Sequence, residues 1–271
     1  MGKRIVTLIT DFGEEDEYAG VMKGVMLTID PSCRSIDVTH RISSQDISEA
    51  AFILSNSYRY FPQGTIHVVV VDPGVGSSRR PIVVAADGHL FVGPDNGVFT
   101  SPLQKEGDRY ACEITNRKFF LSRIGATFHG RDIFSPVAAH LSLGVDPRDL
   151  GREVTDPVIL HEMSPEITRK GIKGKVIHID HFGNLITNIP HDVFASLTRG
   201  KKFTIRIGYL PVKRLSATYS DGEEGELLAL FGSSDRLEFS VKNGNAGDRL
   251  KMGKGEEVEV TECEPGGCGL L

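Results

Sequence analysis

The first half of the chain alternates short apolar runs with stretches that have helical spacing. Residues 5–10, 35–39 and 68–71 are apolar, strand-like runs. Between them, residues 18–29 and 47–58 place apolar side chains three and four positions apart, which predicts two helices. Because alternating strands and helices are typical of parallel sheets, we expect an α/β N-terminal domain with a mainly parallel sheet.

Residues 81–93 depart from this alternation. Asp87 and Gly88 stand between two apolar runs, and an Asp-Gly pair in that position is a strong signal for a β-hairpin. Helical spacing returns at residues 133–141, which predicts another helix. We expect the N-terminal domain to occupy residues 1–158.

The pattern changes beyond a stretch that lacks sustained periodicity. Residues 159–173 are predicted to form a linker. Residues 174–271 then hold short strand-like runs separated by Gly, Asn and Asp turns. The runs lie at residues 176–179, 185–189, 203–207, 227–231, 237–241 and 258–261. This part is therefore expected to be a smaller all-β, barrel-like C-terminal domain.

The composition favours a small-molecule ligand. Apolar residues make up 39% of the 271 residues and charged residues 25%, which is ordinary for a globular protein. The net charge of -5, without a basic cluster, argues against nucleic-acid binding. No apolar run is long enough to span a bilayer, and the N-terminus lacks a signal-peptide core. We expect a cytoplasmic protein that binds neither nucleic acid nor membrane.

The four cysteines give little support to a metal site. Cys33 and Cys112 stand alone and are interpreted as small apolar residues of a reducing compartment. Cys263 and Cys268 bracket Glu-Pro-Gly-Gly near the C-terminus, where a disulfide or half of a metal site is conceivable. Because no second Cys pair or His cluster completes four ligands, we predict no metal and interpret this segment as a tail.

The valine run at residues 68–71 ends at Asp72. Four β-branched residues suit a strand that is buried on both faces, and such strands present ligand-binding groups at their carboxyl ends. The glycines that follow allow a sharp turn, so Arg79 can fold back to orient the carboxylate. Asp72 and Arg79 could thus hold a reacting group, although a helix-capping Asp with a surface Arg has the same pattern.

Two further polar residues lie in loops that follow or precede predicted elements. Asp11 ends the first strand, where a carboxylate can accept two hydrogen bonds from a vicinal diol such as that of ribose. His129 lies before the helix at residues 133–141, and we expect Gly130 to leave open space beside its imidazole. Because an isolated loop histidine is more often structural, the role of His129 depends on its joining Asp72.

The second domain offers one aromatic turn. Asp180-His181-Phe182-Gly183-Asn184 lies between two strands of a predicted hairpin. Phe182 could stack on a purine while a neighbouring amide binds it, although an ordinary turn would look alike. Ser233 and residues 242–246 are polar turns of the same kind.

Five motifs in this order resemble the adenosine-forming S-adenosylmethionine (SAM) hydrolases, also called SAM hydroxide adenosyltransferases, which are relatives of the SAM-dependent fluorinase and chlorinase. The resemblance runs over nearly the whole chain, and the motifs lie at residues 10–13, 72–76, 128–132, 180–184 and 244–246. The resemblance implies an α/β N-terminal domain, a C-terminal β-domain and a homotrimer. It also implies that each active site lies between the N-terminal domain of one subunit and the C-terminal domain of the next.

The resemblance implies substrate-binding residues in both domains. They bind the ribose diol (Asp11), the methionine amino and carboxylate groups (Asp16, Asp180 and Ser233) and the adenine (Phe182, Tyr219, Asn184 and the backbone around Ala246). One departure concerns the methionine end, because many hydrolase relatives have Phe-Gly-Tyr where this chain has residues 234–236, Ser-Asp-Arg.

The resemblance also implies the reaction. Asp72, Arg79 and His129 match the triad of the water-using members, whereas halogenating relatives carry Tyr in place of Asp72 and Ser in place of Gly130. The implied reaction is hydrolysis of SAM to adenosine and L-methionine by in-line attack of an activated water at the ribose 5′ carbon. SAM is the substrate, and no cofactor is expected. Whether Asp72 or His129 accepts the proton is left open.

Two other functions fit parts of the pattern. A metal-dependent phosphoester hydrolase could use Asp11, Asp72, His129 and Asp132, and would lose activity with a chelator. A non-catalytic module could hold SAM or adenosine without turnover.

Overall fold

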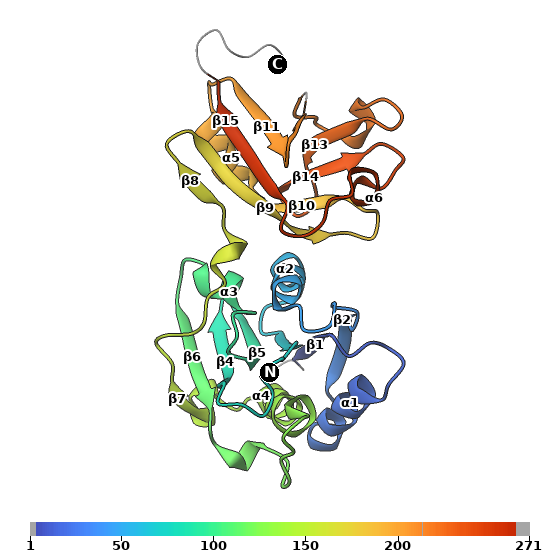
Figure 1. Cartoon of the computed structure of the whole chain (residues 1–271). Coiled ribbons are helices and arrows are strands. Elements are labelled where there is room, and N and C mark those ends of the chain that lie inside the picture. The colour runs from blue at the N-terminus through green and yellow to red at the C-terminus, as the bar shows by residue number, and fades with distance from the viewer. Residues whose placement is uncertain (1–3, 213, 264–271) are drawn as a thin grey trace. The chain divides into compact units, whose positions relative to one another are not determined.

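The computed structural model describes residues 4–212 and 214–263, which form two compact units (Figure 1). The division falls between Leu160 and His161, inside the range 159–173 that is predicted as a linker. Strand β8 (Glu166–Thr168) lies within that range and pairs with a strand of the second unit. Cys268 of the predicted tail lies outside the described residues.

The first unit is built on one seven-stranded sheet. In spatial order its strands are β2 (Arg34–Thr39), β1 (Ile5–Thr10), β3 (Ile66–Val70), β5 (His89–Pro94), β4 (Pro81–Ala86), β6 (Arg109–Ile114) and β7 (Gly151–Glu153). The pairings among β2, β1, β3 and β5 are parallel, and those that link β5, β4, β6 and β7 are antiparallel.

The sheet is therefore mixed, and the expectation of a mainly parallel sheet is not confirmed. The hairpin at Asp87 and Gly88 is the physical reason. Both residues have positive φ, 49° and 75°, as in the tight turns that match the twist of a hairpin. Such a turn reverses the chain between β4 and β5 without a crossover helix, so the strands beyond β5 continue in antiparallel fashion.

Helices cover both faces of this sheet (Figure 1). Helix α1 (Tyr18–Ile29) packs with α4 (Ser135–Ser142) on one face. Helix α2 (Ile47–Ser57) packs with the short α3 (Thr100–Gln104) on the other. Among the described residues, no helix has the length and apolar character needed to cross a bilayer.

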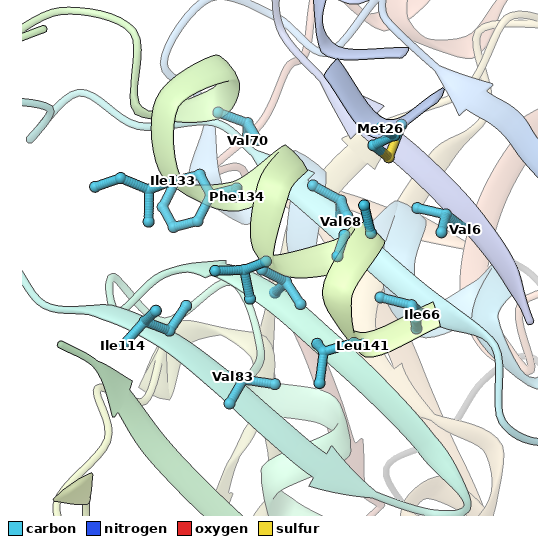
Figure 2. Packing of buried hydrophobic residues seen from close by; sticks show 14 of the residues in the cluster. Val6, Met26, Ile66, Val68, Val70, Val83, Ile114, Ile133, Phe134 and Leu141 are labelled. Atoms are coloured by element: carbon cyan, nitrogen blue, oxygen red, sulfur yellow. The ribbon is translucent and has the colours of Figure 1, made fainter. Parts of the chain in front are cut away.

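Strand β3 is buried on both faces, as its valine run predicts. Val68 and Val70 belong to the core beneath α4, where Figure 2 shows them with Phe134 and Leu141. Val69, between them, is also fully buried. Burial on both faces fixes the register of β3, so the residues that follow it leave the sheet at a defined point. Free Cys112 belongs to the same core, and free Cys33 packs against it, as predicted.

The second unit is an eight-stranded antiparallel sheet. In spatial order its main path is β12 (Leu210–Val212), β11 (Phe203–Ile207), β15 (Glu257–Glu262), β9 (Gly171–Ile179), β10 (Leu185–Pro190), β14 (Arg236–Val241) and β13 (Leu227–Phe231). A bridge between Leu215 and Ala229 brings the two edges together, which nearly closes a barrel. Two short helices, α5 (His191–Thr198) and α6 (Ala246–Leu250), accompany the strands.

Candidate active site

In the first unit, the candidate site lies at the carboxyl ends of β1 and β3. These strands are parallel neighbours, and Thr10 pairs with Val70 at their ends. Asp11 follows Thr10 directly and Asp72 comes two residues after Val70, so both side chains lie at the same edge of the sheet. Together with the loop that carries His129, they line a cavity of about 350 Å³.

Arg79 joins two of the three predicted catalytic residues. Its Nε donates to both carboxylate oxygens of Asp72 at 2.9 Å, and its Nη2 donates to Oδ2 of the same group. The same Nη2 also donates to Nδ1 of His129 at 2.9 Å. The side chains of Asp72 and Arg79 are only 6% and 10% exposed, so the ion pair is largely shielded from water.

This geometry decides between the two interpretations of Asp72. A helix-capping Asp with a surface Arg is wrong, because the Asp72 carboxylate binds a buried guanidinium. The turn after Asp72 is closed by its backbone carbonyl, which accepts from the amide of Val75 at 3.2 Å. The carboxylate therefore remains available at the cavity.

The contact with Arg79 fixes the tautomer of His129. A guanidinium can only donate hydrogen bonds, so Nδ1 of His129 is the acceptor. In the neutral imidazole the proton then resides on Nε2. Burial, followed by the positive charge of Arg79, lowers the pKa of His129 below its ordinary 6.5. At neutral pH the ring is therefore uncharged, with its proton on Nε2, and a hydrogen bond to the backbone of Gly125 opposes the lowering of the pKa only in part.

The loop that carries His129 is held by Asp132, whose side chain is completely buried. Its carboxylate accepts from the amide of Gly125 at 2.7 Å and from Nε of Arg131 at 2.6 Å. A π-helical turn, Gly130–Phe134, follows His129 and leads into α4. Asp132 is thus committed to the loop, which argues against the metal-binding set of Asp11, Asp72, His129 and Asp132.

Gly130 lines the cavity beside His129, as expected, but the space that a side chain at this position would occupy is filled. A Cβ at this position would lie 3.1 Å from Sδ of Met22 and 3.1 Å from the ring of Phe128. The glycine instead allows α1 and the aromatic ring to pack closely beside the loop.

Three aromatic rings form a wall of the cavity that the sequence analysis missed. The rings of Phe12, Tyr18 and Phe128 contact one another with centroids 5.2–5.7 Å apart. Phe128 meets each of the other two rings in edge-to-face geometry. Each ring lies within or near one of the sequence motifs, and this proximity could have indicated that the rings line the site. Asp11 accepts from the amide of Gln45 at 2.8 Å and lies in the cavity lining, whereas Asp16 is exposed and outside it.

The second unit carries a separate cluster around the turn between β9 and β10. Oδ1 of Asp180 accepts from the amides of Phe182 and Asn184, both at 2.9 Å. Oδ2 accepts from Nδ2 of Asn184 at 2.8 Å. Asp180 therefore builds the turn and orients the Asn184 amide. Phe182 is 73% exposed and presents its ring to the outside of the turn.

The loop before α6 packs against this turn. The amide of Gly247 donates to the carbonyl of Gly183 at 3.1 Å, and Ala246 beside it is fully buried. A Cβ on Gly183 would lie 2.1 Å from Cγ of Asn245, so only glycine fits there. The structure thus brings the predicted residues Asp180, Phe182, Asn184 and Ala246 to one region.

Tyr219 joins this region through a residue that the sequence analysis missed. Its hydroxyl donates to Oε1 of Glu238 at 2.5 Å. Burial raises the pKa of both side chains, and the negative charge of Asp180 adds to this effect. Glu238 stands between the apolar residues Leu237 and Phe239 in β14. This acidic residue between two core residues was the only feature of the sequence that could have indicated its role.

Ser233 is not joined to this cluster. It lies exposed in the turn between β13 and β14, and no hydrogen bond among the described residues connects it to Asp180 or Asn184. The described part of the chain also contains no group of three or more His, Cys, Asp or Glu side chains placed to hold a metal ion.

Comparison with known proteins places both units in one family. The models of the SAM hydroxide adenosyltransferase N-terminal and C-terminal domains match residues 6–151 and 174–259. The (R)-S-adenosyl-L-methionine hydrolase of Thermus thermophilus is 37% identical, with 95% of this chain and 99% of the relative covered. The enzyme of the same name from Salinispora tropica is 36% identical over 94% of this chain and 97% of the relative.

A more distant relative and a solved structure also match nearly the whole length of the chain. A fluorinase of Actinopolyspora mzabensis is 26% identical, with 95% of this chain and 97% of the fluorinase covered. The crystal structure of an uncharacterized conserved protein from Thermotoga maritima has a TM-score of 0.86 and 36% identity, covering 94% of this chain and 99% of that one. On these matches, the chain belongs to the SAM hydroxide adenosyltransferase family.

Proposed function

We propose that this protein hydrolyses SAM to adenosine and L-methionine by in-line attack of water at the ribose 5′ carbon. The observation that carries the proposal is the contact of Arg79 with both Asp72 and His129 at the cavity. The names of relatives that are 33–37% identical, all (R)-S-adenosyl-L-methionine hydrolases, support the same reaction.

The chemistry requires an activated water more than an acid. The sulfonium of SAM leaves as a neutral thioether, so the leaving group needs little protonation. Water is a weak nucleophile, and the enzyme must hold it in line with the carbon–sulfur bond and remove a proton during attack. The bond from the water oxygen to C5′ forms as the C5′–S bond breaks, and methionine leaves with the sulfur electron pair.

Asp72 is the group that accepts the proton in this mechanism. Nδ1 of His129 already accepts from Arg79, so His129 could take a proton only by losing that hydrogen bond. Arg79 donates three hydrogen bonds to Asp72, two of them to Oδ2, so Oδ1 retains one lone pair that can take the proton. Nε2–H of His129 donates to the oxygen of the same water and fixes its position.

The remaining predicted residues bind the substrate. Asp11 binds the ribose diol, as its place in the cavity lining supports. Phe182 and Tyr219 stack on the adenine, whose edge is read by Asn184 and the backbone around Ala246. Asp16, Asp180 and Ser233 bind the methionine end. No cofactor takes part, and the protein acts as a homotrimer in which neighbouring subunits complete each other's sites.

Incubation with SAM in ¹⁸O-labelled water tests the reaction. We expect stoichiometric adenosine and methionine, with one label in the 5′ hydroxyl detected by mass spectrometry. Chelator should leave the rate unchanged. Release of adenine, absence of label, or tight binding of SAM without turnover would each contradict the proposal, and the last would favour the non-catalytic module.

A further inference from the structure

Glu238 is a buried carboxylate to which neither the sequence motifs nor the proposed reaction assigns a task. It is 3% exposed in β14, between the fully buried Leu237 and Phe239. Burying a charge costs stability unless hydrogen bonds compensate. Oε1 accepts from Tyr219 at 2.5 Å and from Oγ of Ser240 at 3.3 Å. Glu238 and Ser240 lie on the face of β14 opposite to Leu237 and Phe239, and a carboxylate buried there needs an explanation.

The contact with Tyr219 supplies one, because the tyrosine is held at both of its ends. Its backbone belongs to the short 3₁₀ turn Tyr219–Asp221, where Thr218 and Asp221 form a capping box. Oδ2 of Asp221 accepts from the amides of Ala217 at 2.8 Å and Thr218 at 3.0 Å. The hydroxyl is anchored on Glu238, while the side chain as a whole remains 47% exposed. The exposed part of the ring therefore has a fixed orientation.

We propose that Glu238 is a positioning residue that fixes the ring of Tyr219 for stacking on the adenine of the substrate. This inference rests on the proposed function, in which Tyr219 forms one side of the adenine site. A ring already held in its bound orientation loses less conformational freedom when the ligand stacks on it. A charged acceptor also makes a stronger hydrogen bond to the hydroxyl than a neutral one.

The hydrogen-bond acceptor at position 238, rather than the volume of the side chain, is the feature that acts. Glu238→Gln keeps the size and one acceptor oxygen, whereas Glu238→Ala removes the acceptor. Because positioning affects ground state and transition state alike, KM should rise while kcat changes less than about twofold. We expect KM to rise about threefold in Glu238→Gln and about tenfold in Glu238→Ala, as for loss of part or all of such a hydrogen bond.

A double-mutant cycle with Tyr219→Phe separates positioning from general damage. If Glu238 acts through the hydroxyl, Glu238→Gln should change KM by less than about twofold in the Tyr219→Phe background. The same cycle is measured for the Kd of adenosine by calorimetry, which does not require turnover. The wild-type protein could fail to turn over SAM while the Kd of adenosine still shows coupling between residues 238 and 219. That outcome would contradict the proposed reaction and leave the positioning role supported.

A spectroscopic titration reports the contact itself. The charge of Glu238 helps to raise the pKa of Tyr219, so the ultraviolet tyrosinate titration should show one phenol shifted downward in Glu238→Gln, and that phenol absent in Tyr219→Phe. The proposal is overturned if Glu238→Gln and Glu238→Ala leave KM and Kd unchanged. It is also overturned if the two substitutions raise KM and Kd as much in the Tyr219→Phe background as they do when Tyr219 is present. A decrease in kcat with no change in KM would overturn it as well.

Discussion

At the scale of single residues, the guanidinium group of Arg79 contacts both Asp72 and His129. The sequence analysis brought these three residues together through the family resemblance, and left open whether Asp72 or His129 accepts the proton. In the proposed mechanism, the direction of the hydrogen bond to Nδ1 favours the Asp72 carboxylate as the proton acceptor and the imidazole as a hydrogen-bond donor. This division of roles predicts different outcomes for matched substitutions.

Asp72→Asn should lower kcat by about 10²–10⁴-fold, because an amide cannot accept the proton that a general base removes. His129→Gln carries both an acceptor for Arg79 and an N–H donor, so it should retain about ten times more activity than His129→Ala. Steady-state rates of adenosine formation give both comparisons, and the Kd of adenosine is the control. Near-normal turnover by Asp72→Asn would refute the assignment.

The pH dependence should follow the neutral form of His129. A proton on Nδ1 would face the Arg79 donor, so protonation disrupts the active arrangement. Because burial and Arg79 lower the pKa of His129 from 6.5, kcat should be maintained as pH falls through 6.5 and decline only at lower pH. This acid limb should shift or disappear in His129→Gln. A decline that begins above pH 6.5 would contradict the lowered pKa.

At the scale of elements, the packing of α1 against the π-helical turn explains Gly130. The motif contains a glycine at this position, but its reason is a close approach to Met22 and Phe128 that no local pattern shows. The hairpin between β4 and β5 is the opposite case. Its Asp-Gly turn was predictable from local chemistry, and it also explains why the sheet became mixed.

Gly130→Ala should lower the free energy of unfolding by about 1–3 kcal/mol, as is usual for overpacking a close contact. Gly24→Ala is the matched control in α1, since a Cβ there meets nothing within 4 Å. It should stabilise the helix by about 0.5–1 kcal/mol. Urea denaturation followed by circular dichroism measures both. Equal effects of the two substitutions would show that the contact at Gly130 is unimportant.

A buried histidine pair beside the ring of Tyr58 should make the first unit sensitive to acid. His67 in β3 accepts or donates at 2.7 Å with Thr7 and at 3.2 Å with His89, and burial lowers the pKa of His67 to about 3. As pH is lowered, His67 therefore binds a proton near pH 6.5 in the unfolded chain, but only at much lower pH in the folded one. Stability should be full above pH 6.5 and decrease as pH falls toward 3, by up to about 1.4 kcal/mol per pH unit.

Unfolding by urea between pH 4.5 and 7.5 tests this sign, with His67→Gln as the comparison. The variant should be less stable at neutral pH but should show a shallower decrease on acidification. A wild-type stability that stays constant between pH 6.5 and 4.5 would contradict the prediction.

At the scale of the whole molecule, the candidate groups fall into two clusters, one in each unit. The first unit holds the residues proposed to activate water and bind ribose, and the second holds those proposed to bind adenine. If subunits complete each other's sites in a trimer, light scattering after gel filtration should give three times the mass of one chain. Activity per chain should fall on dilution in parallel with this mass. An active monomer would refute the trimer.

The sequence by itself determined the alternation of the first three strands with two helices, the Asp-Gly hairpin, and the polar residues placed at strand ends, because these depend on side-chain periodicity and on turn chemistry. Tertiary structure decided the mixed sheet, the tautomer of His129, the packing at Gly130 and the contact of Glu238 with Tyr219. These features arise where residues far apart in the chain meet, as Arg79 and His129 do across 50 positions. Hydrogen-bond direction and close packing at such points depend on three-dimensional neighbours, which no local pattern encodes.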